Sequence, residues 1–195
     1  MTETAARLSR RERVRQATVE EIKAVARAQM AAEGTAGVTL RAIAREMGMT
    51  APALYRYFGS RDELVTALVT DAYDALADAM EAAVDAAGPG GHAGRVRAAF
   101  RAFRSWGLGQ PTEFALIFGS PIPGYVAPEA TRPAGVRYTD LLGRLLAEAV
   151  ADGALDPARI DVRVPPALVR QVEAFQRWRG GPALPAPVLA FGLGA

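Results

Sequence analysis

The feature that most constrains this chain is a pair of short predicted helices joined at a glycine. The first, "LRAIAREM" over 40–47, follows Thr39, a good N-cap residue, and ends at Gly48. The second, "APALYRYF" over 51–58, follows Thr50, which we expect to cap it. Two short helices joined by such a turn predict a helix-turn-helix.

The side chains of this pair divide between packing and contact. Ala44 is small enough to let the two helices cross closely, and Leu54 and Phe58, four residues apart, lie on one face that we expect to be buried. Tyr55 and Tyr57 fall on other faces, where a ring can rest on protein while its hydroxyl reaches a phosphate. The pair therefore predicts both a small core and a polar contact face.

Helices are also predicted on both sides of this pair. Ser9 begins a capping-box pattern that opens a helix ending at Gly34, and Ser60 begins another that opens a long helix ending in the glycine-rich segment 88–94. A proline-rich loop is expected over 120–133. Further helices are predicted over 95–108, 111–119, 136–150, 166–178 and from 187. With no alternating strand pattern, the fold class is all-α.

Charge is distributed unevenly along the chain. Residues 1–61 contain 11 Lys and Arg against 6 Glu, whereas residues 62–195 contain 12 basic and 15 acidic side chains. A basic N-terminal segment on an acidic remainder favours a polyanionic partner for that segment, although a solvated basic face has the same composition. With no cysteine and no apolar run long enough to cross a bilayer, we expect a cytoplasmic protein that does not enter the membrane.

The sequence does not favour an enzyme. Its single histidine, His92, lies in the glycine-rich segment, and no cluster with metal-ligand spacing or phosphate-binding glycine loop occurs. Glu113, Asp140 and Glu148 are expected to be surface charges on helices. No catalytic residue, cofactor or metal ion is therefore predicted.

At residues 39–64 the sequence "TLRAIAREMGMTAPALYRYFGSRDEL" resembles the DNA-binding signature of the TetR family of bacterial transcriptional regulators. The segment 111–125, "PTEFALIFGSPIPGY", resembles one branch of that family more loosely. The resemblance implies a three-helix helix-turn-helix domain over 1–62, followed by a helical-bundle ligand-binding and dimerisation domain over 63–195. It also implies a palindromic double-stranded DNA operator, a small and often apolar effector, and a homodimer.

The resemblance implies three roles in DNA binding. The start of the first helix of the pair, with Thr39 and Arg41, lies against the duplex, and Arg45 on the same helix is a further candidate. The leading face of the recognition helix is formed by Thr50, Ala51, Pro52 and Ala53, with Arg56 as a further base contact. Phosphate contacts are assigned to Tyr55, Tyr57 and Arg61. The two alanines lack hydrogen-bonding groups, so their best contact is a thymine methyl. Arg61 stands where the family usually has lysine.

Each of these assignments has an alternative. Arg41 fits a solvated helix face, but beside this motif we favour DNA; Arg45 fits both equally. Tyr57 also fits a cover for the edge of the small domain, with phosphate contact favoured.

Effector binding is expected from aromatic residues of the second domain. The candidates are Phe103, Trp106, Phe114, Phe118 and Tyr125. Taken singly, each fits a core position better, and the resemblance favours a pocket for the group. Trp106 and Tyr125 are preferred because each joins a polar atom to a large apolar face, whereas Phe100 is expected to be core.

The mechanism expected is a ligand-responsive repressor, with an activator also open. Leu168, Val172 and Phe175 form a stripe that fits either a dimer interface or the intramolecular core. The sequence stops soon after the helix predicted from Pro187 begins, earlier than in the family, which leaves open a weaker dimer or a longer natural chain. The alternative function is a helical small-molecule-binding or interaction module without sequence-specific DNA binding.

Overall fold

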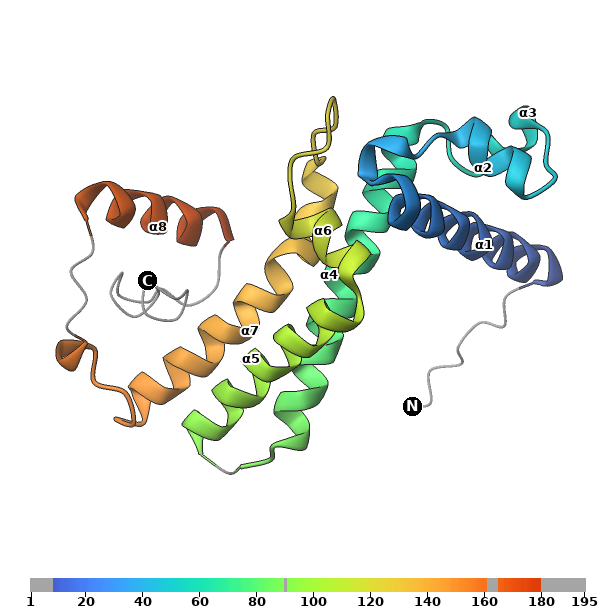
Figure 1. Ribbon diagram of the computed structural model, residues 1–195. Helices are drawn as coiled ribbons and strands as arrows, with labels where there is room; N and C mark the ends of the chain where they lie inside the picture. Colours follow the sequence, from blue (N-terminus) through green and yellow to red (C-terminus); the bar gives the residue numbers. More distant parts are fainter. Residues whose placement is uncertain (1–8, 90, 161–164, 180–195) are drawn as a thin grey trace. The chain divides into compact units, whose positions relative to one another are not determined.

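The computed structural model describes residues 9–89, 91–160 and 165–179 of the 195-residue chain. Within these residues every regular element is helical, which confirms the all-α prediction (Figure 1). The helices are α1 (Arg10–Glu33), η1 (Thr35–Gly37), α2 (Leu40–Glu46), α3 (Ala51–Leu54), α4 (Arg61–Ala86), α5 (His92–Gly109), α6 (Pro111–Phe118), η2 (Glu129–Thr131), α7 (Arg132–Ala151), η3 (Pro157–Arg159) and α8 (Pro166–Arg179). The helix expected from Pro187 lies outside the described residues.

The predicted capping box at the start of α1 is present. The Glu12 N–H donates to Ser9 Oγ over 3.2 Å, and the Ser9 N–H donates to Glu12 Oε2 over 2.7 Å. Hydrogen bonds to the Glu12 carboxylate, first from the Ser9 side chain and second from the Ser9 backbone, lower the pKa of Glu12. At the other end, Gly34 stops the helix with φ of 78° while its N–H bonds to Met30 O. Local capping therefore fixes both ends of α1.

The turn between α2 and α3 depends on Gly48. Its φ of 64° lies in the left-handed region, and the next N–H, that of Met49, donates to Ala44 O over 2.8 Å. Thr39 caps α2 as predicted, since its Oγ accepts the Ala42 N–H over 3.2 Å. The expected side-chain cap by Thr50 is wrong, because this residue makes no capping hydrogen bond.

Helix α3 is shorter than the predicted helix over 51–58. It ends at Leu54 and a tight turn follows, in which Tyr57 N donates to Leu54 O, three residues back, over 2.8 Å and Phe58 N donates to the same carbonyl over 3.2 Å. This tighter turn brings Phe58 into the core, where it is 5% exposed. The helix is therefore too short to be stable in isolation and depends on tertiary packing.

The chain divides into two compact units, one comprising 1–69 with 111–128 and the other 70–110 with 129–195. The division into functional domains over 1–62 and 63–195 stays a prediction. In the first unit, α1, the α2–α3 pair and the start of α4 share a core of Ile22, Ala26, Met30, Val38, Leu40, Ile43, Leu54, Phe58, Leu64 and Leu68. Burial of each large aliphatic side chain contributes about 1.5–3 kcal/mol.

Helix α6 belongs to this first unit and packs against α1. Arg27 on α1 and Glu113 on α6 form an ion pair of 3.5 Å. The loop after α6 returns to α4, where the hydroxyls of Tyr125 and Thr66 lie 3.1 Å apart. Segment 111–128 is thus joined by polar contacts to both α1 and α4.

The second unit is centred on α5 and α7, which pack together, and on residues 70–86 of α4. Arg137 on α7 bonds to three carboxylates of α4, at 3.4 Å from Asp74 and 2.6 Å from both Asp78 and Glu81. Those hydrogen bonds, chiefly from Glu81, raise the pKa of Arg137 above its already high value, so the guanidinium stays charged. The network ties the two helices together.

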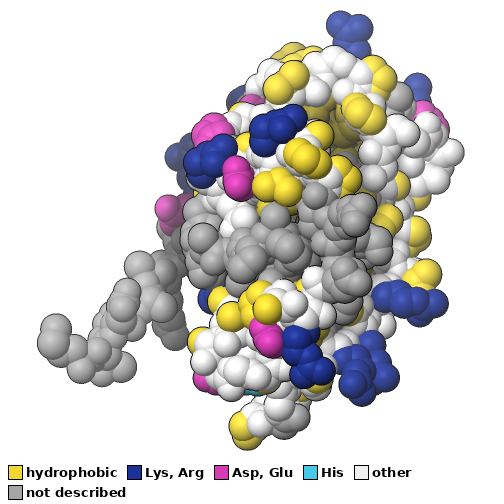
Figure 2. Space-filling view, turned by 90° about the vertical axis from the view of Figure 1, so that its left-hand side faces the viewer, with side chains coloured by type: hydrophobic (Ala, Val, Ile, Leu, Met, Phe, Trp, Pro, Cys, Tyr) yellow, Lys and Arg dark blue, Asp and Glu magenta, His cyan; other side chains and the backbone are white. Residues whose placement is uncertain are grey.

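The expectation that Phe100 is core is wrong, because its side chain is 42% exposed. The buried position on α5 is the preceding residue, Ala99. One residue along a helix turns the side chain by about 100°, so burial of Ala99 directs Phe100 away from the packed face. Figure 2 shows other hydrophobic side chains interspersed with Lys and Arg over the face it displays.

We predict that Gly48→Val destabilises the first unit by about 1–3 kcal/mol, because an L residue is strained in the left-handed region. A Cβ at Gly48 meets no atom within 4 Å, so the strain comes from the backbone alone. Chemical denaturation of the full chain measures the change. Gly48→Asn should lose less, and the control Gly94→Ala, in α5, should not lose stability; a Gly48→Val variant as stable as wild type would contradict the turn's role.

Candidate nucleic-acid interface

The α2–α3 pair presents a polar surface above the core of the first unit. Leu40, Ile43 and Ala44 of α2 and Leu54 of α3 are buried, so the remaining faces of these helices point outward. The exposed candidates are Thr39, Arg41, Arg45, Thr50, Pro52, Tyr55 and Arg56, and the half-buried ones are Ala51, Ala53, Tyr57 and Arg61. The structure therefore places all of the predicted DNA-contact residues on or next to this helix pair.

The N-terminal ends of α2 and α3 differ in how their threonine hydroxyls are used. Thr39 Oγ accepts a backbone N–H, which leaves its O–H free to donate to a phosphate. Thr50 makes no capping hydrogen bond, so its hydroxyl keeps both donor and acceptor capacity at the front of α3. These two hydroxyls and the exposed Arg41 are suited to hydrogen bonding with phosphates and base edges.

The leading turn of α3 is small and apolar. Ala51 and Ala53 are half-buried and Pro52 is exposed in the first turn, where it lacks an N–H to satisfy. Such a surface allows a backbone to approach closely and offers methyl groups to a thymine methyl. Hydrogen-bonding capacity at this point of the helix pair comes from Thr50 and the exposed Arg56.

Arg15 on α1 braces the end of this helix pair. Both of its terminal nitrogens lie 3.4 Å from Arg56 O, and its Cζ lies 5.1 Å from the centroid of the Tyr57 ring. The guanidinium thus holds the turn after α3 by a shared carbonyl and by a cation–π contact. The sequence analysis did not single out Arg15, because its partners lie 41 and 42 residues away.

Arg61, in the first turn of α4, also has partners within the protein. Its Nε donates to Val38 O over 3.0 Å and its Nη2 to Thr35 O over 3.1 Å. A third contact, from Nη1 to Asp62, measures 3.8 Å. The guanidinium is therefore attached to the connection between α1 and α2.

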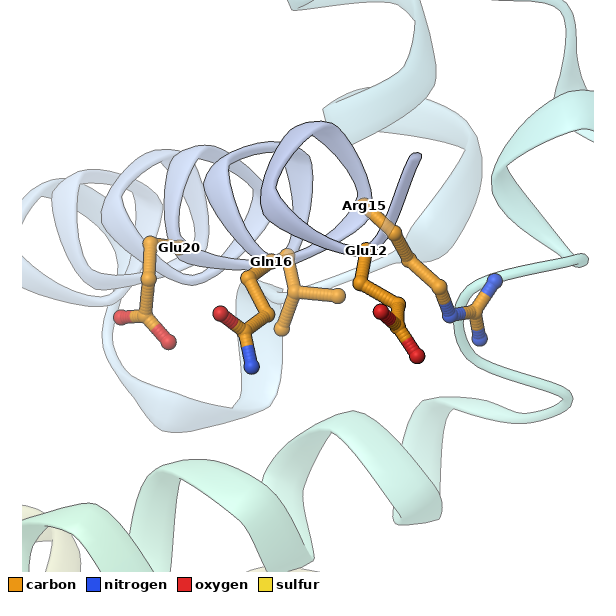
Figure 3. A pocket seen from close by; sticks show the side chains of 5 residues that line it. Glu12, Arg15, Gln16 and Glu20 are labelled. Carbon is orange, nitrogen blue, oxygen red and sulfur yellow. The ribbon is translucent and has the colours of Figure 1, made fainter. Parts of the chain in front are cut away.

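A groove of about 490 Å³ runs beside the start of α1 and is lined by Glu12, Arg15, Gln16, Val19 and Glu20 (Figure 3). Its two carboxylates would repel a phosphate backbone. Among these five lining residues the only cation is Arg15, which already donates to the Arg56 carbonyl and contacts the Tyr57 ring. This groove is thus a poor site for DNA, unlike the surface of the α2–α3 pair.

The predicted effector residues fall in both compact units. Phe103 and Trp106 lie on α5 in the second unit, whereas Phe114 and Phe118 lie on α6 and Tyr125 follows them in the first. Phe114 and Phe118 contact each other with ring centroids 5.0 Å apart. Their role in effector binding stays a prediction.

Two tyrosines extend the aromatic group around Phe103. The rings of Tyr73 and Tyr138 are stacked at 6.1 Å, and Tyr138 lies 6.4 Å from Phe103. Burial, with a smaller effect of Tyr73, raises the pKa of Tyr138 to about 12. The helical periods of α4 and α7 place both tyrosines on packed faces, a signal that the sequence analysis left unused.

His92 is the first residue of α5 rather than part of a linker. Its Nε2 lies 3.0 Å from Asp152 Oδ2, and Arg95 in the same turn lies 2.6 Å from Glu148. These contacts join the start of α5 to the end of α7. The described residues contain no group of three or more His, Asp and Glu side chains able to hold a metal ion.

Comparison with known families identifies both parts of the chain. The profile described as "Bacterial regulatory proteins, tetR family" matches residues 22–68, which include the α2–α3 pair and the start of α4. The profile described as "Tetracyclin repressor-like, C-terminal domain" matches residues 96–176. The chain belongs to the tetR family. The resemblance seen in residues 39–64 is thereby confirmed.

Relatives of similar sequence carry names that agree with the assignment. The "HTH-type transcriptional regulator Rv1816" of Mycobacterium tuberculosis and "HTH-type transcriptional regulator Mb1846" of Mycobacterium bovis are each 42% identical to this chain over 147 residues. The match covers 75% of this chain and 62% of each relative, so the chain spans less than two thirds of their length. These relatives are regulators rather than enzymes, in agreement with the sequence analysis.

The fold is also found in solved structures. The crystal structure of the protein SCO4313 is 34% identical, with a TM-score of 0.72, and the match covers 95% of this chain and 81% of that one. A second structure, from Rhodococcus sp. RHA1, is 26% identical with a TM-score of 0.64 over 98% of this chain and 95% of that one. Both likenesses extend over nearly the whole of this tetR-family chain.

We predict that Arg15→Met destabilises the first unit of this tetR-family protein by about 0.5–1 kcal/mol, because methionine keeps part of the aliphatic stem but loses the cation–π contact with Tyr57. Urea denaturation measures the difference. Arg11→Met removes an exposed arginine from the same helix and should be neutral. Equal stability of the Arg15 and Arg11 variants would remove Arg15 as a brace.

Proposed function

We propose that this chain is a DNA-binding transcriptional regulator that reads a palindromic operator as a homodimer. The observation that carries this proposal is the α2–α3 pair, in which a buried core holds the four-residue helix α3. Pro52 is exposed on this helix, and Thr50, Tyr55 and Arg56 are exposed directly beside it. The match of residues 22–68 to the tetR profile supports the same function. We further propose that it acts as a cytoplasmic repressor released by a small apolar effector.

Base reading on this proposal comes from few side chains. Arg41 and Thr50 provide hydrogen bonds to base edges, with Arg56 as a further donor, while Ala51 and Ala53 contact thymine methyl groups. An arginine that contacts guanine through two hydrogen bonds discriminates against the wrong base by about 1–3 kcal/mol. Tyr55 and Tyr57 contribute through their hydroxyls to phosphate binding, which positions the protein without reading sequence.

Two copies are proposed because one helix-turn-helix covers little of the groove. In a two-fold dimer the reading helices enter half-sites whose centres are about 34 Å apart. Leu168 and Phe175 on α8 are each 38% exposed, so this helix offers an apolar surface to a second copy. Val172 on the same helix is buried within the chain, so the stripe contributes to both packing and the proposed interface.

The proposed effector binds the second domain and disfavours the dimer geometry that fits DNA. Its free energy of coupling to the operator is typically about 1–3 kcal/mol. Helix α4 begins beside the reading helices and continues into the second unit, so it is the proposed connection between the two functions. The effector changes DNA affinity only by preferring one spacing of the reading helices over the other.

A mobility-shift titration tests the function directly. A duplex carrying the region upstream of the protein's own gene should shift at lower protein concentration than a scrambled duplex of the same length and composition. Equal affinity for the two duplexes, and for upstream regions of other genes in a genome-wide selection, would favour the alternative of a helical small-molecule-binding or interaction module.

None of the helices in the described part of the chain has the length and hydropathy to span a bilayer.

We predict that Arg41→Ala weakens operator binding by about 1–3 kcal/mol and relaxes preference at one base pair in each half-site. Tyr57→Phe should instead weaken binding to all duplexes alike, because it removes a phosphate contact. Titrations of each variant against operators with single base changes separate the two roles. If both variants are folded and bind like wild type, these residues are not in the interface.

We predict that Trp106→Ala abolishes the response to the effector while leaving operator affinity nearly unchanged. The effector used is the compound from a small-molecule screen that releases the wild-type protein from its operator. Trp106→Phe, which keeps an aromatic ring, is the matched control and should retain part of the response. If Trp106 is instead a core residue, Trp106→Ala costs about 3–5 kcal/mol of stability and lowers every activity together.

A further inference from the structure

The connection between α1 and α2 determines where the reading helices begin. Gly34 ends α1 in the left-handed region, η1 makes one tight turn, and Val38 follows with a fully buried side chain. Thr39 then caps α2, and Arg41 lies in its first turn. A shift of this connection therefore moves the start of α2 and the arginine proposed to read a base.

The arginine at the start of α4 holds this connection from outside. Two nitrogens of Arg61 donate to two carbonyls three residues apart, those of Thr35 and Val38, over 3.1 and 3.0 Å. The side chain is 27% exposed, so these hydrogen bonds are partly shielded from water. Neither distance is longer than a normal N–H···O hydrogen bond.

We propose that Arg61 is a positioning residue that sets the specificity of DNA reading by fixing the start of α2, rather than a phosphate contact. This inference rests on the proposed function. The family resemblance implied a phosphate role for a cation at this position, which lysine usually fills. The structure places the guanidinium on backbone carbonyls of its own chain, so its charge acts within the protein.

The choice of arginine has a geometric reason. A guanidinium presents its N–H groups in a rigid planar fork, which can reach two acceptors at once with a fixed direction. A lysine ammonium is a single point on a flexible stem and does not reproduce both hydrogen bonds with the same orientation. The Arg61→Lys variant therefore distinguishes the two roles. Lysine keeps the charge and would maintain a phosphate contact, but it would not maintain both hydrogen bonds to the backbone carbonyls.

The test compares Arg61→Lys and Arg61→Gln with wild type in titrations by fluorescence anisotropy. The specific probe is a duplex that the wild-type protein selects from a random pool, and the non-specific probe is a scrambled duplex, each measured over a range of salt concentrations. Arg104→Gln, which removes one exposed cation from α5, is the control for net charge and should bind both probes like wild type.

Both Arg61 variants should bind the selected duplex about tenfold more weakly, as for loss of one aligned base contact. Their affinity for the scrambled duplex and the slope of log affinity against log salt should stay unchanged. The inference would be overturned if Arg61→Lys bound the selected duplex like wild type while Arg61→Gln had a slope of log affinity against log salt that is smaller by about 0.9 per lost phosphate contact. Unchanged specificity in both variants would also overturn it.

A measurement without DNA separates this inference from the proposed function. Hydrogen exchange of the full chain should be faster in both variants at the amides of Ala42 and Ile43, which bond to Thr39 in the first turn of α2. If wild-type protein selects no sequence, the proposed function fails, while faster exchange still supports the attachment of Arg61. Unchanged exchange at these two amides would show that Arg61 does not hold the start of α2.

Discussion

Burial of Leu54 is the interaction on which the reading surface depends. Helix α3 has four residues, and so short a helix does not form in water by its own hydrogen bonds. Leu54, fully buried at its C-terminal end, and Phe58, buried after the following turn, anchor it to the core that α1 and α2 provide. Apolar contacts thus hold in place the exposed residues that precede Leu54 or lie between Leu54 and Phe58. The polar groups of these residues are therefore available to a ligand.

Arginine has two kinds of role in this chain. Arg15, Arg61 and Arg137 each bond to groups of the protein itself, respectively a carbonyl beside an aromatic ring, two carbonyls, and three carboxylates. Arg41 and Arg45 are exposed on α2. The positive charge of the N-terminal segment is consequently a poor guide to which cations meet DNA, and geometry separates the structural guanidiniums from those available to a partner.

Features governed by neighbouring residues could be predicted from the sequence. The caps at Ser9 and Thr39, the turn at Gly48 and the burial of Leu54 follow from short-range patterns, and the structure confirms each. The family signature extended these patterns to a list of candidate contact residues, which the structure places on or next to one helix pair.

Features that depend on distant residues were not predicted. The two carbonyls bound by Arg61 lie 23 and 26 residues before it, and the carbonyl bound by Arg15 lies 41 residues after it, so no local pattern reveals them. Phe100 was assigned to the core from its aromatic character, but the rotation of α5 against its neighbours buries Ala99 instead. The aromatic residues predicted to bind an effector fall in two compact units, a division that no local pattern in the sequence indicates.

Hydroxyl-radical footprinting on a duplex selected by the wild-type protein tests the central claim most directly, since it maps where the protein lies on DNA. The account predicts protection centred on two half-sites about 34 Å apart, related by the dyad of the sequence. The same footprint should disappear in Leu54→Ala protein that remains helical in its second unit. Uniform protection along the duplex, or an unchanged footprint in Leu54→Ala protein, would contradict the account.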